Sequence, residues 1–235
     1  MASLSAIILT LFPDMFPGTL GQSLAGTALK KGTWSLETIN IRDFATDRHR
    51  TVDDSPYGGG TGMVLKPDIV HAAVEAAKAK LPNAQIIYTS PRGAPLNQAI
   101  VNKLVLQDMI ILCGRFEGVD QRVIDHHNML EISLGDFVLS GGEIAAQAIL
   151  DACVRLLPGV IGKADATAQE SFGLSLDYAG LLEYTHYTRP PLWLGQSVPE
   201  VLLSGNHEQI NAWRLQQAKN ITQARRPDLM KNKKE

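Results

Sequence analysis

The stretch Ser133–Glu143, SLGDFVLSGGE, combines three glycines with two acidic residues and contains no lysine or arginine. Glycine lets backbone atoms approach a ligand closely, because it has no Cβ atom. A loop with carboxylates and no cation is poorly suited to phosphate. We therefore expect it to hold a flat, polar ligand that is neutral or positively charged, such as the adenosine and sulfonium groups of S-adenosylmethionine.

The familiar nucleotide-binding motifs are absent. No G-x-x-x-x-G-K-[ST] sequence occurs, and Gly58–Gly62 (GGGTG) lacks the spacing and the preceding strand of a dinucleotide fingerprint. That stretch is either a flexible turn or a loop that orders on a substrate. The flanking DRHRTVDD, with His49 and Asp53, could contact phosphates and base edges, or could form a surface cluster of ion pairs.

Metal and nucleophile patterns are equally weak. His126 and His127 are adjacent and have no partner at helical spacing, so the sequence predicts no metal site. No G-x-S-x-G sequence is present. Cys113 and Cys153 show no metal or redox spacing, and we interpret them as reduced core cysteines of a cytosolic protein.

The charge distribution suggests a polyanionic partner. The 235 residues carry a net charge of −2. Residues 206–235, however, hold seven lysines and arginines against three acids. A basic tail on an acidic body is consistent with polyanion binding, and equally with a solvated terminal helix. No run approaches the roughly 18 apolar residues of a membrane span, and the N-terminus resembles mature protein rather than a signal peptide.

Strands and helices alternate along the first two thirds of the chain. We expect a mostly parallel sheet with helices on both faces, which binds ligands beyond the carboxyl ends of its strands. Three glycine- or proline-bearing stretches follow expected strands, at Ser90–Gly93, Gly114–Asp120 and Gly135–Gly142. The expected strands are 6–12, 34–41, 84–89, 109–113 and 129–133, and the expected helices are 19–31, 68–81, 96–106, 121–127 and 142–157.

The last of these helices has an apolar face made by Ile144, Ala145, Ala148, Ile149, Ala152, Cys153 and Leu156. The polar stretch 162–176 reads as a linker, and we place a domain boundary within residues 160–176. A further helix begins at Ser204 or Asn206, with Ile210 and Trp213 as its packing residues.

Several motifs in order give the chain a family resemblance: LFPDMF, DRHRTVDDSPYGGGTGM, SPRG, CGRFEGVDQRV, SLGDFVLSGGE, LPGVIG, HYTRP and VLLSGNHEQI. Together they resemble the bacterial tRNA (guanine-N1)-methyltransferases called TrmD, of the SPOUT class, over essentially the whole chain. The resemblance implies a cofactor-binding domain over residues 1–160 with a deep trefoil knot, and a flexible linker at 161–176. It also implies a small all-α tRNA-binding domain at 177–235, and a homodimer whose active site is shared between subunits.

By this resemblance, S-adenosylmethionine is bound by the three stretches already singled out, much of it through main-chain groups. His49 and Asp53 are expected to approach the target guanosine. The implied cofactor-binding residues are Tyr88, Thr89, Ser90, Pro91, Gly114, Arg115, Glu117, Gly118, Ser133, Leu134, Gly135, Asp136, Phe137, Val138, Leu139, Gly141 and Gly142.

The family methylates ring N1 of the guanosine just 3′ of the anticodon. That reaction needs a base for the N1 proton and a cation for the charge on O6. The corresponding positions are Glu170 and Arg155. By themselves, Glu170 would read as a solvated carboxylate and Arg155 as a complement to a helix dipole. The family usually has Asp where this chain has Glu170, and Tyr where it has Phe137.

Two other functions stay open from the residues. The chain could be another knotted methyltransferase acting on ribosomal RNA or on a ribose hydroxyl, or an RNA-binding module without catalysis. The resemblance also implies help from magnesium, which no ligand spacing in the sequence supports. The expected location is the cytoplasm, with no membrane contact.

Overall fold

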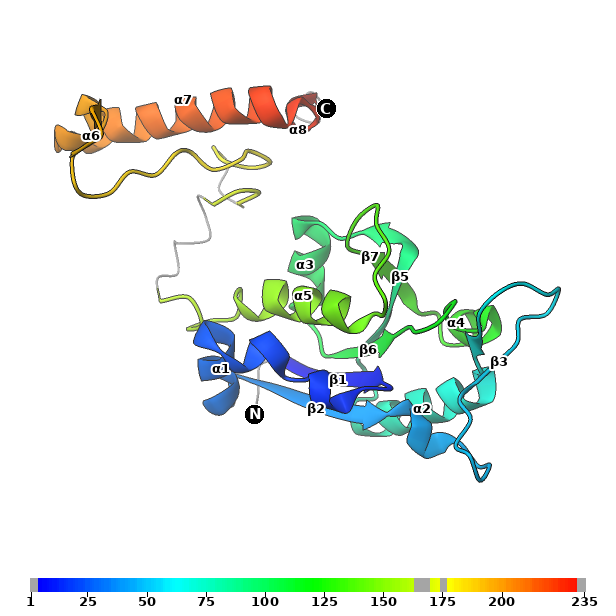
Figure 1. Cartoon of the computed structure of the whole chain (residues 1–235). Helices are drawn as coiled ribbons and strands as arrows, with labels where there is room; N and C mark the ends of the chain where they lie inside the picture. Colours follow the sequence, from blue (N-terminus) through cyan, green and yellow to red (C-terminus); the bar gives the residue numbers. More distant parts are fainter. Residues whose placement is uncertain (1–3, 163–169, 174–176, 232–235) are drawn as a thin grey trace. The chain divides into compact units, whose positions relative to one another are not determined.

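The computed structural model of the protein describes residues 4–162, 170–173 and 177–231 (Figure 1). The chain divides into two compact units, residues 1–161 and 162–235. The division falls where the sequence becomes polar after the last apolar helix of the first unit.

The first unit is built on a five-stranded sheet in which all neighbouring strands are parallel. The strand order is β2-β1-β6-β5-β7. The central strand β6 is buried throughout, which explains its unbroken apolar sequence MIILC. The predicted parallel sheet is therefore confirmed. Its strands are β1 (Leu4–Thr10), β2 (Trp34–Asn40), β5 (Gln85–Pro95), β6 (Met109–Cys113) and β7 (Leu130–Ser133).

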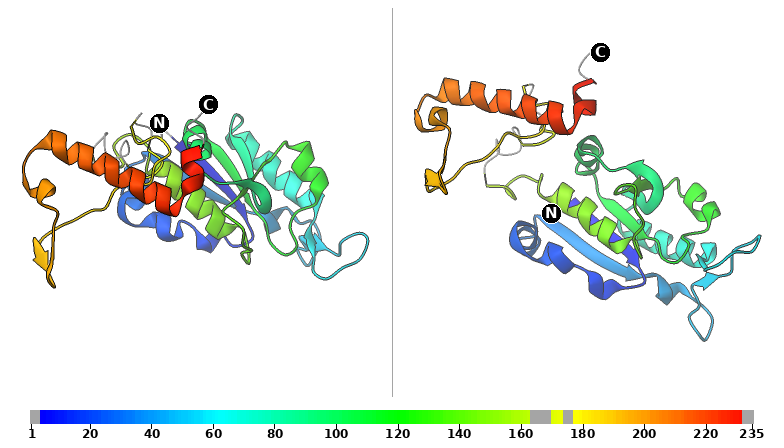
Figure 2. Two further views of the ribbon diagram at one scale, coloured as in Figure 1. Left: turned by 90° about the horizontal axis from the view of Figure 1, so that it is seen from above. Right: turned by 45° about the horizontal axis from the view of Figure 1, so that its top comes forward.

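Helices cover both faces of this sheet, as predicted (Figure 2). Helices α1, α3 and α5 share one hydrophobic cluster with the sheet, and α2 and α4 share the other. The helices are α1 (Ser23–Lys30), α2 (Pro67–Lys80), α3 (Gln98–Leu104), α4 (Gln121–His126) and α5 (Glu143–Val154). Short 3-10 turns cover Pro13–Met15, Gly18–Gly21 and Ile41–Phe44.

The carboxyl ends of β5, β6 and β7 meet at one edge of the sheet. Thr89 on β5 pairs with Cys113, the last residue of β6, and with Ile132 near the end of β7. The segments that follow these three strands must therefore start side by side.

Strand β5 is longer than the predicted range 84–89. After an irregularity between Thr89 and Ala94 it pairs with β7 again. A Cβ atom on Gly93 would lie 2.4 Å from the backbone of Glu131 and Ile132. Glycine at this position lets the strand return so close to β7.

Helix α5 begins with a buried charge rather than an apolar residue. Glu143 is fully buried, whereas Ile144 is 51% exposed, so the predicted inward position of Ile144 is wrong. The inward face includes Ala146, Ile149 and Leu150. Periodicity alone missed this rotation, because the Glu143 carboxylate has buried partners on other segments.

Two other helices differ from their predicted ranges. The predicted helix 19–31 is interrupted at Gln22, after which α1 starts with Ser23 at a positive φ. The predicted helix 96–106 shortens to α3, because the Asn97 side chain caps it by accepting the backbone N–H of Ile100 at 3.0 Å.

The second unit has its own small core around Tyr178, Leu181 and Ala218. The expectation that this unit is all helical is wrong, because an antiparallel hairpin precedes its helices. Asn206 caps α7, as one of the two predicted alternatives has it. The elements are β8 (Leu192–Trp193), β9 (Gln196–Ser197), α6 (Glu200–Leu203), α7 (His207–Arg225) and α8 (Pro227–Lys231). None of the described helices is both long and apolar enough to cross a bilayer.

Candidate functional site

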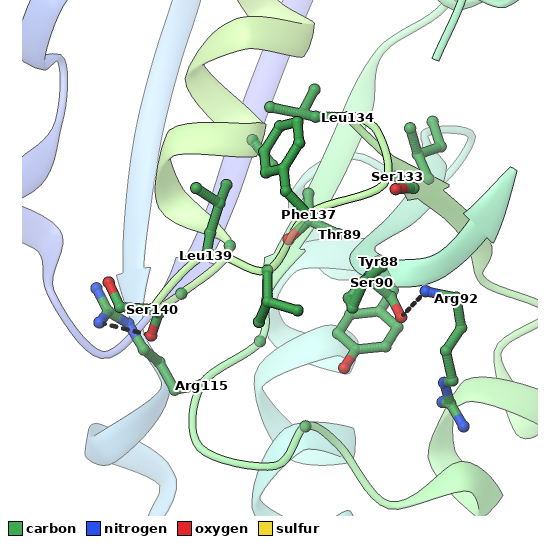
Figure 3. Close-up of a pocket in the computed structure, with 18 of the residues that line it drawn as sticks. Tyr88, Thr89, Ser90, Arg92, Arg115, Ser133, Leu134, Phe137, Leu139 and Ser140 are labelled. Atoms are coloured by element: carbon green, nitrogen blue, oxygen red, sulfur yellow. Dashed lines mark hydrogen bonds between the residues drawn. The ribbon is translucent and has the colours of Figure 1, made fainter. Parts of the chain in front are cut away.

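A pocket of about 240 Å³ lies at the carboxyl edge of β5, β6 and β7 (Figure 3). A water molecule occupies about 30 Å³ in the liquid, so the space suits an organic ligand. In Figure 3 the apolar side chains of Leu134, Phe137 and Leu139 lie along one side, with Tyr88 and Ser90 opposite them. Three loops that are far apart in the sequence thus form one cavity.

All the residues predicted to bind the cofactor line this pocket, except Gly135 and Asp136. The sequence prediction missed five lining residues, of which four lie within or next to a predicted stretch and Ala145 lies on the first turn of α5. They are Arg92, Phe116, Ile132, Ser140 and Ala145.

Gly142 lets the loop before α5 lie against the strand ends. A Cβ atom at this position would be 2.0 Å from Thr89 Oγ1 and 2.9 Å from the Cα atom of Cys113. The Gly142 N–H also donates to the carbonyl oxygen of Gly114 at 2.9 Å. The glycine of the motif is therefore required for packing between the loops, which fixes the shape of the pocket.

A buried ion pair braces the same loop. Arg115 Nη2 lies 2.9 Å from Glu143 Oε2, and Arg115 Nη1 donates to the carbonyl oxygen of Ser140 at 3.2 Å. Thr10 Oγ1 donates to Glu143 Oε1 at 2.8 Å. The Arg115 guanidinium also lies 4.3 Å from the centre of the Phe12 ring. Because Glu143 is fully buried, Arg115 serves to compensate its charge.

The second arginine of the pocket is also engaged. Arg92 Nη2 donates to Gln121 Oε1 at 3.1 Å and lies 3.7 Å from Glu131 Oε2. The exposed Glu117, by contrast, adds a negative charge to the pocket lining. Arg115 is thus paired with a buried carboxylate, and the largely exposed Arg92 lies near another. This charge distribution agrees with the expectation that the ligand is not a phosphate.

Burial changes the titration of two lining or adjacent groups. It raises the pKa of the Tyr88 phenol, which therefore stays a neutral hydroxyl at physiological pH. Burial and the neighbouring Glu143 raise the pKa of the Cys113 thiol well above its usual range. Cys113 is consequently an inert core residue rather than a nucleophile.

The long loop between β2 and α2 is attached to one wall of the pocket. It contains β3 (Asp53–Asp54) and β4 (Val64–Leu65), which pair antiparallel. The Glu117 N–H donates to the carbonyl oxygen of Met63, and the Leu65 N–H to that of Gly118, both at 2.9 Å. Asp53 is therefore one strand away from the pocket segment, and His49 lies in the exposed part of the same loop.

The two predicted reaction residues do not line the pocket. Arg155 is the C-cap residue of α5 and is partly buried in the first unit. Glu170 belongs to the second unit, where its carbonyl oxygen accepts the Gly173 N–H at 2.8 Å. The turn that begins at Glu170 is held by a further hydrogen bond, in which the Phe172 N–H donates to the carbonyl oxygen of Leu181 at 2.9 Å. Most of the predicted linker 161–176 lies outside the described residues.

The second unit contains a smaller cavity of about 180 Å³. Its lining includes the rings of Tyr184, Tyr187 and Trp213. The Arg214 guanidinium lies 5.0 Å from the centre of the Tyr184 ring. Aromatic rings beside an arginine are the usual means of binding unpaired nucleic-acid bases.

The histidines are arranged differently from the sequence expectation. His126 and His127 have no partner at helical spacing, but α2 brings His71 next to them. The sequence prediction of no metal site considered only partners at helical spacing on the same helix, whereas the third histidine lies on another helix.

Comparison with known proteins gives one consistent result. The family described as "tRNA (Guanine-1)-methyltransferase TrmD" matches residues 4–232. A protein from Rhodospirillum rubrum is 58% identical over 97% of this chain and 92% of its own length. One from Rickettsia akari is 52% identical over 99% of this chain and its entire length. Both are named tRNA (guanine-N(1)-)-methyltransferase.

Proposed function

The chain belongs to the tRNA (guanine-N1)-methyltransferase family, and we propose that it methylates ring N1 of the guanosine immediately 3′ of the tRNA anticodon, with S-adenosylmethionine as methyl donor. The observation that carries the proposal is the pocket at the ends of β5, β6 and β7. It is lined by glycines and backbone, and both of its arginines are engaged with carboxylates.

The lining suits S-adenosylmethionine in three respects. Backbone groups of Gly114 and of residues 134–139 would hold the adenine and ribose, and Leu134 and Leu139 offer apolar surface to the base. Glu117 would favour the positive charge of the ligand. When bound, S-adenosylmethionine would supply a methyl group from its sulfonium sulfur. After the transfer the sulfur would remain in the product as a neutral thioether.

Glu170 and Arg155 carry the proton and charge chemistry in this proposal. Guanine N1 holds a proton at neutral pH, so the Glu170 carboxylate removes it before N1 can attack the methyl carbon. Negative charge then builds on O6, where the Arg155 guanidinium stabilises it. The two residues belong to different units. Their meeting at one guanosine is part of the proposal, through a homodimer with a shared active site.

An exposed apolar surface supports the homodimer. Phe116, Phe137, Val138 and Ile144 are between 51% and 84% exposed, all on the pocket loops or the start of α5. Such a concentration of exposed apolar residues is typical of a protein interface. The deep knot expected for the family would involve the same loops.

The second unit and the long loop would bind the tRNA. Unpaired bases could enter the aromatic cavity around Tyr184 and Trp213, while the basic residues of α7 meet phosphates. His49 and Asp53 would approach the target guanosine from the loop attached to the pocket wall. We propose the cytoplasm as its location, because a tRNA substrate would be met there.

The decisive test is methyl transfer from labelled S-adenosylmethionine to unmodified tRNA, with mapping of the modified nucleoside. Glu170→Gln should lower turnover by about 100-fold or more, because Gln cannot take the N1 proton. Glu200→Gln, which neutralises an exposed carboxylate of the same unit, is the matched control and should keep full activity. Full activity of Glu170→Gln would refute the base assignment and favour a ribose methylase.

The role of Arg155 is tested by comparing the effects of its substitution on kcat and on cofactor affinity. Arg155→Ala should lower kcat by more than about tenfold and leave cofactor affinity nearly unchanged, because the negative charge on O6 that it stabilises develops only in the transition state. Calorimetry with S-adenosylmethionine and steady-state kinetics with tRNA would measure the two effects. Weaker cofactor binding with normal kcat would contradict this role.

A further inference from the structure

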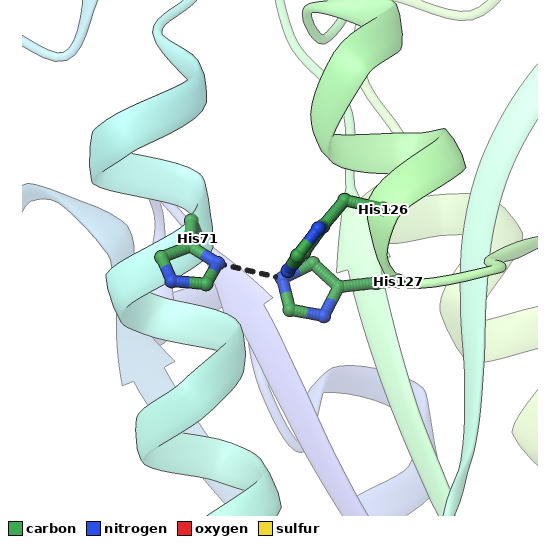
Figure 4. Close-up of side chains that lie close together, drawn as sticks. All are labelled: His71, His126 and His127. Atoms are coloured by element: carbon green, nitrogen blue, oxygen red, sulfur yellow. Dashed lines mark hydrogen bonds between the residues drawn. The ribbon is translucent and has the colours of Figure 1, made fainter.

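Three histidines from two helices converge on the face of the sheet covered by α2 and α4 (Figure 4). His71 lies on α2, His126 is the last residue of α4, and His127 follows it as the C-cap residue. The two helices belong to the same hydrophobic cluster, where Val70 and Val74 of α2 and Val123 of α4 are buried. The packing of α4 on α2 therefore fixes the distance between the imidazoles.

We propose that His71, His126 and His127 form a binding site for a divalent transition-metal ion, with Zn²⁺ as the ion that fits best. Their potential ligand atoms all lie within 4.8 Å of one another. His71 Nδ1 and His127 Nε2 are 3.0 Å apart. Zinc–nitrogen bonds of about 2.0–2.1 Å in a tetrahedron separate the ligands by roughly 3.3 Å. One pair is thus almost in place.

His126 completes the set by a small side-chain movement. Its ring centre is 5.4 Å from that of His71 and 4.8 Å from that of His127. His71 and His126 are exposed and can rotate, whereas His127 is buried and fixed. The exposed side of the cluster leaves a fourth position open to water, as in zinc sites with three protein ligands.

The carboxylate of Glu75 lies near the buried His127 ring. Glu75 Oε1 lies 3.8 Å from His127 Nδ1, the nitrogen that does not face His71. Histidines that bind metals commonly direct their second nitrogen to a carboxylate, which orients the ring. Glu75 also forms an ion pair with the nearby Lys78 ammonium at 2.7 Å, so the positive charge of Lys78 repels a bound metal ion less strongly.

The alternative is a simple hydrogen bond between His71 and His127 that joins the two helices. That account leaves the position of His126 unexplained and predicts no response to metal ions. Imidazole ligands favour zinc, nickel and copper, whereas magnesium prefers oxygen. The site is therefore distinct from any magnesium requirement of methyl transfer. A bound ion would join α2 to the end of α4, the helix that follows the pocket segment Gly114–Asp120.

Titration calorimetry of the chelator-treated 235-residue chain with ZnCl₂ tests the proposal. We expect one equivalent to bind with micromolar affinity, and the melting temperature to rise by several degrees at saturation. MgCl₂ should do neither. His71→Gln and His126→Gln should each weaken zinc binding at least tenfold, while His207→Gln, an exposed histidine of the second unit, should not.

Each variant should first show an unchanged circular dichroism spectrum and melting temperature without metal, as exposed side chains permit. Should either cluster variant fold poorly, the absorption spectrum of Co²⁺ bound to the unaltered protein provides an independent measure of tetrahedral nitrogen coordination. The absence of zinc binding by the unaltered protein would overturn the proposal. So would equal weakening by His207→Gln, or zinc binding that survives both cluster substitutions.

Discussion

Glu143→Gln is expected to destabilise the first unit more than an ordinary loss of charge would. The carboxylate is fully buried and accepts from Thr10 Oγ1 at 2.8 Å and Arg115 Nε at 3.1 Å. Arg115 Nη2 also lies 2.9 Å from Oε2, so the amide nitrogen of glutamine would face the guanidinium at either oxygen position and leave its positive charge uncompensated. Removing one partner of a buried pair costs about 3 kcal/mol or more.

This energy translates into a measurable shift in melting temperature. At about 2.1 cal/mol/K per residue, unfolding the 161-residue unit has an entropy of about 0.34 kcal/mol/K. A loss of about 3 kcal/mol therefore lowers the melting temperature by roughly 9 °C. Cofactor affinity should fall as well, because Arg115 also binds the carbonyl oxygen of Ser140 in the pocket loop.

Scanning calorimetry of the full chain, following the transition that S-adenosylmethionine shifts, measures the effect. Asp43→Asn is the control, since Asp43 pairs with Arg50 at 3.4 Å on the exposed surface. Such a pair contributes at most about 1 kcal/mol, so the substitution should shift the transition by no more than about 3 °C. Removing both charges with Arg115→Met and Glu143→Gln should cost less than the sum of the single substitutions. Equal shifts for Glu143→Gln and Asp43→Asn, or strict additivity, would refute the reasoning.

Three further outcomes follow from the same structure. Gly142→Ala should abolish cofactor binding in calorimetry, since its Cβ atom would lie 2.0 Å from Thr89 Oγ1. Gly162→Ala should bind the cofactor normally, because among the described residues only chain neighbours lie within 4 Å of the added Cβ atom. Equal affinities of the two variants would count against the pocket. Cys113 and Cys153 should resist maleimide at pH 8 in the folded protein and react fully in denaturant. Burial raises the pKa of the Cys153 thiol to about 12 and that of the Cys113 thiol well above its usual range. Rapid labelling of the native protein would contradict this expectation. Ile144→Asp should convert the proposed homodimer to a monomer in light scattering, because it puts a charge into the exposed apolar surface. A dimer mass that the substitution leaves unchanged would exclude this surface as the interface.

The sequence determined the sheet and the segments that form the pocket. Strand β6 was predicted with its observed bounds, because a fully buried parallel strand needs an unbroken apolar run. Ser90, Gly114 and Gly142 were singled out as belonging to one site, since loops after parallel strands meet at one edge of a sheet. Local residue types and the alternation of strands and helices along the chain suffice for such inferences.

Tertiary structure alone decided which distant side chains meet. The sequence placed Glu143 among the acids of the glycine-rich loop, but its carboxylate is buried and paired with Arg115 and Thr10. His71 gains His126 and His127 as neighbours only because α4 packs on α2. Periodicity reports which face of an element is apolar, whereas the pairing of polar groups depends on contacts between residues far apart in the chain.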